Sequence, residues 1–333
     1  MANSYAYAVA RIRVLETRLL SREQVERLIE ADSPDEVLRR LGDSRYASYI
    51  AEAGESLDFE AMLDREALAL RRLMGEITPD PVLTDAFFLR YDYHNIKVYV
   101  KRQGARVEVD DLISLAGTMS PAKLKESVAN HDYSGLDPAM RHGLQAVDEQ
   151  TSMAVDPQRT DTILDQALYV QILGSLGKGP AHDFVRDLFV GEVDRINLRT
   201  LLRAKRDEMD LKVLTDSLLP GGTIAHSFWG KAMDMPLELL AEEPTVRRLG
   251  TGVAEGVRFY EKTGRMTEYE RRMDMAQMEK ARSARHNPFG IEPVIGYLLA
   301  VENELKMIRL IMVAKTNHIP EGKLRERLRD VYV

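Results

Sequence analysis

The sequence predicts an all-α fold built from three similar helical repeats. In almost every segment the apolar residues recur with the spacing of an amphipathic helix, and strand-like alternation is scarce. Three stretches also resemble one another: YDYHNIKVYVKR at 91–102, VDRINLRTLLRA at 193–204 and NELKMIRLIMVA at 303–314. One helical module used three times accounts for both observations.

Each copy of the module carries an acid five residues before a cation. The pairs are Asp92 with Lys97, Asp194 with Arg199, and Glu304 with Arg309. The acids lie 102 and 110 residues apart, whereas the units of a solenoid run roughly 20 to 50 residues. We therefore expect a body with pseudo-threefold symmetry. Its repeats are predicted at 1–109 (with an additional N-terminal helix), 110–218 and 219–333.

Each repeat is predicted to contain short helices, then a long helix, then the helix that carries the acid and the cation. The long helices are expected at 57–74, 158–173 and 245–283, the last with a break near Thr263-Gly264. The acid and cation helices are expected at 83–103, 182–208 and 293–315.

Helix starts are marked in the first two repeats. A helix over 4–20 is followed by Ser21 and Gln24, which have the spacing of a capping box. Ser33-Pro34 places an N-cap before a proline at the first turn of a helix that ends near Gly42. Ser120-Pro121 repeats this helix start, so the order of the helices recurs as well as the sequence motif of the repeat helix.

Composition excludes several classes of protein. The chain has no cysteine, which rules out disulfides, thiolate metal sites and cysteine nucleophiles. Its net charge of −7 argues against a nucleic-acid-binding protein. The N-terminus has no apolar core of signal-peptide type, and no run of 18 uncharged apolar residues occurs. We therefore expect any membrane contact to go through a partner.

No catalytic, cofactor or metal site is predicted. The loop GSLGKG at 174–179 lacks the spacing of a phosphate-binding loop and follows a helical segment, so a turn is the better interpretation. The seven histidines are scattered and include no zinc-binding helix pattern. No serine nucleophile elbow is present either.

The polar residues of the three repeat helices have two interpretations. Acid and cation lie about 140° apart around a helix, so they do not pair with each other easily. In one interpretation each cation bonds an acid of the neighbouring repeat and stabilises the body. In the other, the helices line a central cavity and present cations to a partner. The candidate partner-binding residues are Lys97, Lys101, Arg199, Arg203 and Arg309.

Two further features allow either packing or partner contact. The methionines at 266, 273, 275 and 278 could form an adaptable surface, although core packing is the commoner role. Trp229, beside Phe228, could be an exposed interface anchor or part of a core.

The chain resembles the C subunits of bacterial and archaeal V-type (A-type) ATPases, which are similar to the d subunit of the eukaryotic enzyme. The resemblance rests on NPFGIEPVIGYLLA at 287–300, ELKMIR at 304–309 and LRERLRDVYV at 324–333. DAFFLRYDYHNIK at 85–97 and DRINLR at 194–199, with RAK at 203–205, fit the family's internal motif. The resemblance spans essentially the whole chain.

The resemblance implies a funnel-like, non-catalytic subunit of the central rotor. Such a subunit lies on the cytoplasmic face of the membrane as a peripheral component. It links the central stalk, made of the D and F subunits, to the proteolipid rotor ring. It thereby transmits torque between ATP hydrolysis or synthesis and the transport of protons or sodium ions. The resemblance implies no cofactor, no nucleic acid, and membrane contact only through the ring.

Two other classes remain as alternatives. The repeat could belong to a helical scaffold protein with an unrelated partner. A helical enzyme would need a concave pocket with clustered acids and histidines, and the sequence predicts none.

Overall fold

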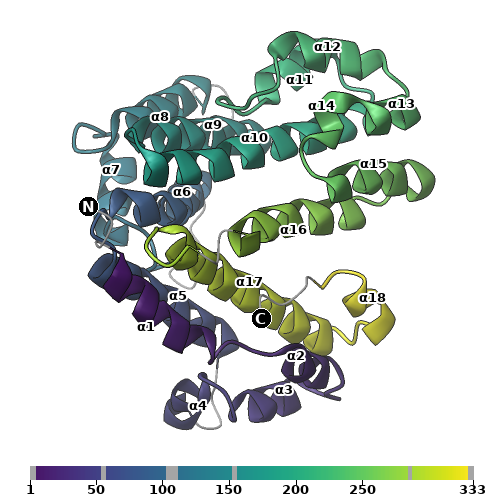
Figure 1. Ribbon diagram of the computed structural model, residues 1–333. Coiled ribbons are helices and arrows are strands. Elements are labelled where there is room, and N and C mark those ends of the chain that lie inside the picture. The colour runs from purple at the N-terminus through teal and green to yellow at the C-terminus, as the bar shows by residue number, and fades with distance from the viewer. Residues whose placement is uncertain (1–4, 54–57, 103–111, 152–155, 284–286, 329–333) are drawn as a thin grey trace. The chain divides into compact units, whose positions relative to one another are not determined.

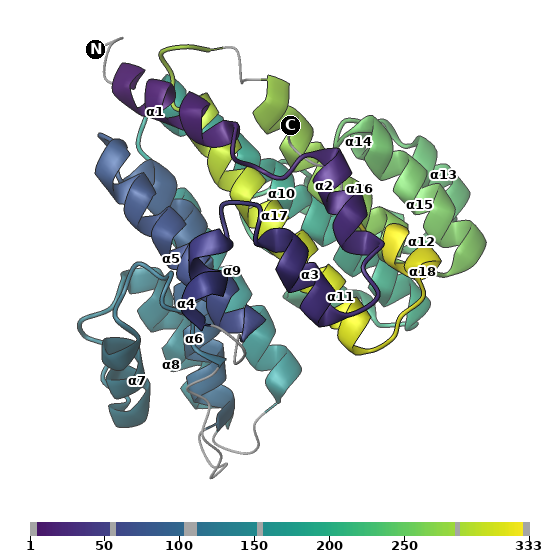
Figure 2. The same ribbon diagram turned by 90° about the horizontal axis from the view of Figure 1, so that it is seen from below.

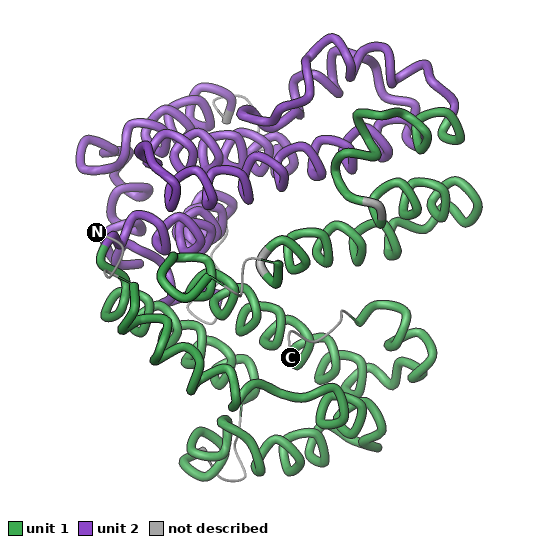
Figure 3. The backbone as a smooth tube through the Cα atoms, in the orientation of Figure 1, with its two compact units in different colours: residues 1–79, 237–333 green, residues 80–236 purple. Residues whose placement is uncertain are grey.

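The computed structural model describes residues 5–53, 58–102, 112–151, 156–283 and 287–328. Every regular element in these residues is an α-helix, which confirms the predicted all-α class (Figures 1 and 2). The contacts group the chain into two compact units, one formed by residues 1–79 with 237–333 and the other by residues 80–236 (Figure 3). The division into three repeats is a separate proposition and stays a prediction.

The first unit combines the beginning and the end of the chain around one buried helix. Its N-terminal helices are α1 (Ala6–Glu16), α2 (Arg22–Ile29), α3 (Pro34–Leu41), α4 (Ala47–Ala53) and α5 (Phe59–Ile77). Its C-terminal helices are α13 (Leu237–Glu242), α14 (Pro244–Arg247), α15 (Thr251–Thr263), α16 (Thr267–Ser283), α17 (Glu292–Thr316) and α18 (Glu321–Arg325). Helix α17 packs against α1, α3, α5, α16 and α18, and most of its residues are buried. A helix that is apolar on nearly all sides is expected in such a central position.

The second unit is built on two long helices. Its helices are α6 (Val82–Arg102), α7 (Pro121–Asn130), α8 (Pro138–Thr151), α9 (Pro157–Ser175), α10 (Pro180–Arg206), α11 (Leu211–Ser217) and α12 (His226–Asp234). Helix α6 packs against α7, α9 and α10, while α10 also contacts α11 and α12. The rings of Phe87 and Phe189 lie 4.7 Å apart where α6 meets α10. Trp229 of α12 is buried in this unit, so the structure excludes its interpretation as an exposed anchor.

Several helix signals read from the sequence are confirmed. Ser21 forms a complete capping box with Gln24, and the Ser33 side chain caps α3 with Pro34 at its first turn. The predicted break lies where it was expected, because Gly264 adopts a left-handed conformation between α15 and α16. Such a conformation is available to glycine without the steric cost that a side chain brings.

The helix ends differ from the predictions by a few residues. Helix α1 begins at Ala6 and ends at Glu16, four residues short of the predicted end. Helix α10 ends at Arg206, because Glu208 turns into the left-handed region. Helix α5 continues to Ile77 beyond the predicted end. The predicted boundaries at 4, 57 and 103 lie outside the described residues.

Two more surface predictions can be compared with the fold. Met278 is buried, whereas Met266, Met273 and Met275 are half-buried, so packing accounts for one of the four methionines in full. In the part of the chain that the structure describes, no helix has both the length and the apolar content needed to span a membrane.

Candidate functional site

The acid of the first repeat helix is buried and holds a loop. Asp92 on α6 has no exposed surface. One of its carboxylate oxygens accepts hydrogen bonds from the Thr118 backbone N–H at 2.9 Å and the Thr118 hydroxyl at 2.6 Å. The other oxygen accepts one from the Met119 N–H at 3.0 Å. A buried carboxylate is costly unless such donors satisfy it, so this contact fixes the loop that leads into α7.

The acid of the second repeat helix makes the same contacts. Asp194 on α10 accepts from the Thr223 N–H at 3.0 Å, the Thr223 hydroxyl at 2.6 Å and the Ile224 N–H at 3.2 Å. The held residues lead into α12, as Thr118 and Met119 lead into α7. The two repeat helices therefore position a later helix, α7 for α6 and α12 for α10, by one common device, which we call the carboxylate clasp.

An asparagine three residues after each acid completes the clasp. Asn95 donates to the Ser114 carbonyl at 2.8 Å and accepts from the Ser114 N–H at 2.9 Å. Asn197 does the same with the carbonyl and N–H of Leu219, at 2.9 and 2.7 Å. Each asparagine side chain thus bonds both the backbone N–H and the backbone carbonyl of one buried loop residue, as a neighbouring strand would.

A glycine lets each acid approach its loop. A Cβ atom at Gly117 would lie 2.1 Å from an oxygen of Asp92, and one at Gly222 would lie 2.2 Å from an oxygen of Asp194. Real Cβ atoms do not come so close, so the loop needs glycine at both positions. On α6 and α10 the clasp therefore consists of an Asp-x-x-Asn sequence on the helix and a Gly-Thr pair in the loop, while its general feature is a buried carboxylate that accepts a backbone N–H before a helix.

The acid of the third repeat helix is buried too, but its partners differ. Glu304 on α17 accepts from the Leu20 N–H at 2.6 Å and from the Tyr46 hydroxyl at 2.7 Å. The Arg45 guanidinium lies 3.1 Å away. Position 307 holds methionine, so the amide of the other two clasps is missing here.

Sequence reasoning found the three acids but missed the rest of the clasp. The shared asparagine was visible at the third position after Asp92 and Asp194. The Gly-Thr pair also recurs at 117 and 222, close to the spacing of the helices themselves. The role of the asparagine and of the Gly-Thr pair becomes visible only in the structure, where they lie in contact.

A buried ionic cluster surrounds the third acid. Arg45 lies between Glu304 and Glu66, with 3.1 Å to an oxygen of each. Burial alone would lower the pKa of Arg45, but Tyr46 and the two carboxylates outweigh it and raise that pKa. Burial raises the pKa of Glu66, and the charge of Arg45 opposes this shift. Two carboxylates share one guanidinium here, which leaves a buried excess of negative charge.

The first pair of candidate cations forms ion pairs with one neighbouring helix. Lys97 lies 2.6 Å from Asp165 and 3.9 Å from Asp161, and Lys101 lies 2.6 Å from Asp161. Both acids belong to α9. These contacts favour the interpretation in which the cations join helices to one another.

The remaining candidate cations differ in their surroundings. Arg309 makes a two-pronged contact with Glu60 of α5, and both side chains are nearly half exposed. Arg199 is half-buried, and its guanidinium forms neither a hydrogen bond nor an ion pair with the described residues of its own unit. Arg203, one turn further along α10, is exposed. The structure thus leaves Arg199 as the candidate with the fewest local contacts.

The glycine-rich loop at 174–179 is a turn between two helices. Helix α9 runs to Ser175, and Arg186 donates to the Leu176 carbonyl at 2.8 Å. The Gly177 N–H donates to Nδ1 of His182 at 3.1 Å, so it is not available to a phosphate. A helix in place of a strand before the loop also disagrees with a phosphate-binding loop.

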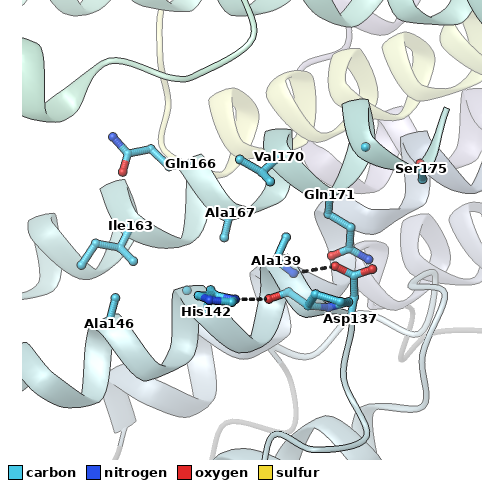
Figure 4. Close-up of a pocket in the computed structure, with 13 residues that line it drawn as sticks. Asp137, Ala139, His142, Ala146, Ile163, Gln166, Ala167, Val170, Gln171 and Ser175 are labelled. Carbon is cyan, nitrogen blue, oxygen red and sulfur yellow. Dashed lines mark hydrogen bonds between the residues drawn. The ribbon is translucent and has the colours of Figure 1, made fainter.

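A groove of about 590 Å³ lies between α8 and α9 (Figure 4). Ile163, Ala167 and Val170 contribute apolar lining. Its polar residues are engaged locally, since His142 contacts the Pro138 carbonyl and Gln171 accepts from the Tyr93 hydroxyl. Asp137, His142 and Ser175 all line it, but in the described residues no hydrogen bond joins any two of them, and each bonds a backbone group instead. Elsewhere in the described residues, no group of three or more histidine or acidic side chains could hold a metal ion.

Comparison with known proteins identifies the class. The model of the ATP synthase (C/AC39) subunit family matches residues 8–327. The chain is 24% identical to the C subunit of the V-type sodium ATPase of Enterococcus hirae, over 96% of this chain and 97% of that protein. It is 28% identical to the C subunit of the A-type ATP synthase of Methanocaldococcus jannaschii, over 97% of this chain and 86% of that protein. For the C subunit of the A-type ATP synthase of Methanosarcina acetivorans the identity is 26%, over 98% and 93%.

In the described residues, the buried acids and the ion pairs of Lys97, Lys101 and Arg309 serve contacts within this chain. The chain belongs to the ATP synthase (C/AC39) subunit family, that is, to the C subunits of V- and A-type ATPases. This membership confirms the resemblance and agrees with the expectation of a non-catalytic subunit.

The clasp predicts a specific loss of stability in Asp194→Asn. Only one of the two carboxylate oxygens becomes an NH2 group, which would face either the Thr223 N–H or the Ile224 N–H and leave that donor without an acceptor. The free energy of unfolding of this unit should therefore fall by about 2–4 kcal/mol. Urea unfolding followed by fluorescence measures this directly, because the one tryptophan of the chain, Trp229, lies in the helix that the clasp positions. Asp216→Asn, an exposed change in the same unit, should shift it by less than about 0.5 kcal/mol. Equal shifts in the two variants would contradict the clasp.

The ionic cluster predicts how stability depends on pH. Because burial raises the pKa of Glu66 above 4.5, the folded state binds this proton more readily than the unfolded state. Stability contributed by Glu66 is therefore lost as pH rises through the raised pKa and is regained as pH falls. The free energy of unfolding of the native protein, minus that of Glu66→Gln, should increase as pH is lowered from above the raised pKa of Glu66 towards 4.5.

Urea titrations followed by circular dichroism at several pH values measure this difference. Glu23→Gln, an exposed change on α2, is the matched control and should keep the native pH profile. A difference between native protein and Glu66→Gln that stays constant with pH would show that Glu66 does not titrate in this way.

Proposed function

We propose that this chain is the non-catalytic adaptor of a rotary ATPase or ATP synthase. In this role it receives the foot of the central stalk, formed by the D and F subunits, and rests on the proteolipid rotor ring. It transmits torque between ATP hydrolysis or synthesis and the transport of protons or sodium ions. The observation that carries the proposal is the family match, which extends over residues 8–327.

The internal contacts of the chain support an adaptor that must be stiff. The carboxylate clasps fix the start of α7 and α12 with several hydrogen bonds each, in addition to helix packing. Hydrogen bonds to a charged acceptor are about twice as strong as neutral ones. A body tied in this way can transmit torque without local unfolding.

The location on the membrane follows from the same role. We infer a peripheral protein on the cytoplasmic face, with the ring as its contact to the membrane. The described residues contain no membrane-spanning helix, which is consistent with attachment through a partner. The repeats 1–109, 110–218 and 219–333, and their arrangement as a funnel-like, pseudo-threefold body, belong to this proposal. The recurrence of the clasp on α6 and α10 supports it.

Contact with the stalk is proposed to be electrostatic. A stalk that meets a ring of different symmetry is better served by charged contacts than by matched pockets, and such contacts weaken in salt. All five cations named from the sequence stay candidates. Arg199 is the best placed, since contact with Lys97, Lys101 or Arg309 would compete with the ion pairs that those residues form. Arg203 is exposed one turn further along the same helix, so it can extend a contact made by Arg199.

The double variant Arg199→Ala with Arg203→Ala should weaken binding of the stalk subunits about three- to tenfold, because exposed interface charges contribute on the order of 1 kcal/mol or less each. Titration of the purified D and F subunits, at low and at high salt, measures the affinity. Lys212→Ala, an exposed lysine in the same unit, is the matched control and should leave it unchanged.

Thermal unfolding separates partner contact from internal stabilisation. The arginine variant should keep the melting temperature of the native protein. Unchanged stalk affinity, or a fall in melting temperature that accounts for a loss of binding, would remove these two residues from the interface. Failure of the native chain to recover stalk and ring from membranes that contain the assembled enzyme would contradict the adaptor function itself.

A further inference from the structure

The partner of the third clasp comes from the opposite end of the chain. Asp92 and Asp194 hold loops that follow 26 and 29 residues later, whereas Glu304 holds Leu20, which is 284 residues away. All contacts of Glu304 named above lie within one compact unit. In the other two clasps the held residue follows the acid closely in the sequence. At Glu304 a residue of the N-terminal segment takes that position.

The position of the held amide is the same in all three cases. Each carboxylate accepts from the N–H of a residue that stands two positions before a helix. These residues are Met119 before α7, Ile224 before α12 and Leu20 before α2. The register of helix and loop is thus preserved although the connection differs.

The helices that follow also bury the same position. Five residues after the held amide come Leu124, Trp229 and Val25, respectively. All three are buried, with exposed fractions of 0%, 2% and 6%. Helix α2 therefore corresponds to α7 and α12 in its core contact as well as in its start.

The differences at the third clasp have a physical explanation. The Gly-Thr pair is replaced by Arg18-Leu19, so the loop carries a Cβ atom where the other two loops have none. With this Cβ atom the loop cannot approach the repeat helix as closely. Glutamate, one methylene longer than aspartate, spans the larger distance between helix and loop. The Tyr46 hydroxyl supplies the donor that a threonine hydroxyl supplies elsewhere.

We propose that Glu304 is a latch that joins the two ends of the chain, and that the contacts of the three repeat helices follow a cyclic order. Helix α6 holds the start of α7, α10 holds the start of α12, and α17 holds the start of α2. The C-terminal helix α18 reinforces this closure, because Arg325 forms an ion pair with Glu26 of α2. This inference does not depend on the proposed rotor function.

The latch is tested by converting it into the clasp of the other repeats. Glu304→Asp shortens the acid and should lose the Leu20 contact. Arg18→Gly with Leu19→Thr rebuilds the Gly-Thr pair, which suits aspartate. We expect Glu304→Asp to speed amide exchange in residues 19–30 by about tenfold or more, as loss of a charge-assisted hydrogen bond requires. The triple variant should return exchange to within about threefold of the native rate.

Hydrogen exchange with mass spectrometry on the intact protein gives the readout. Asp92→Glu is the control, because it disturbs the clasp of α6 and should leave residues 19–30 unchanged. Native exchange in Glu304→Asp, or a triple variant no better protected than Glu304→Asp, would overturn the proposal. If Glu304→Asp does not fold, Tyr46→Phe removes one donor and should raise exchange about threefold. No change in that variant would equally overturn the latch.

Discussion

The fold depends on buried carboxylates that accept hydrogen bonds from backbone N–H groups. A charge without partners in a helical core would cost several kcal/mol, so each acid demands that its loop lie in one place. Asp92 and Asp194 meet this demand with the same donors, on different helices. The loops in turn fix where the next helix begins. The carboxylate oxygens thus connect a local sequence motif to the position of a helix that lies further along the chain.

Around this constraint the polar residues of the repeat helices take different roles. Lys97 and Lys101 join α6 to α9, while Arg45 holds two carboxylates near α17. Exposed ion pairs contribute little to stability, whereas buried ones mainly specify which groups must meet. Arg199 stands apart from both kinds. The first cation position therefore serves an internal contact on α6, whereas on α10 the side chain of Arg199 has no ion pair among the described residues of its unit.

Much of the fold could be predicted from the sequence, because helix signals are local. The caps at Ser21 and Ser33 and the break at Gly264 need only neighbouring residues. The partners of the acids could not be predicted, since they lie 26 to 284 residues away. Trp229 shows the same limit: the sequence allowed both an exposed anchor and a core position, and only packing within the unit shows that it is buried. Which helices pack together depends on the tertiary structure, and the spacing of residues along the sequence does not determine it.

The most direct test of this account is the exchange rate of single backbone amides in the unaltered protein, resolved by nuclear magnetic resonance. The account predicts that the N–H groups of Met119, Ile224 and Leu20 are protected as strongly as helix interiors, although none of them lies in a helix. Neighbouring loop amides without a carboxylate partner should exchange faster. Exchange of these three amides at the rate of open loops would contradict the central role of the carboxylates.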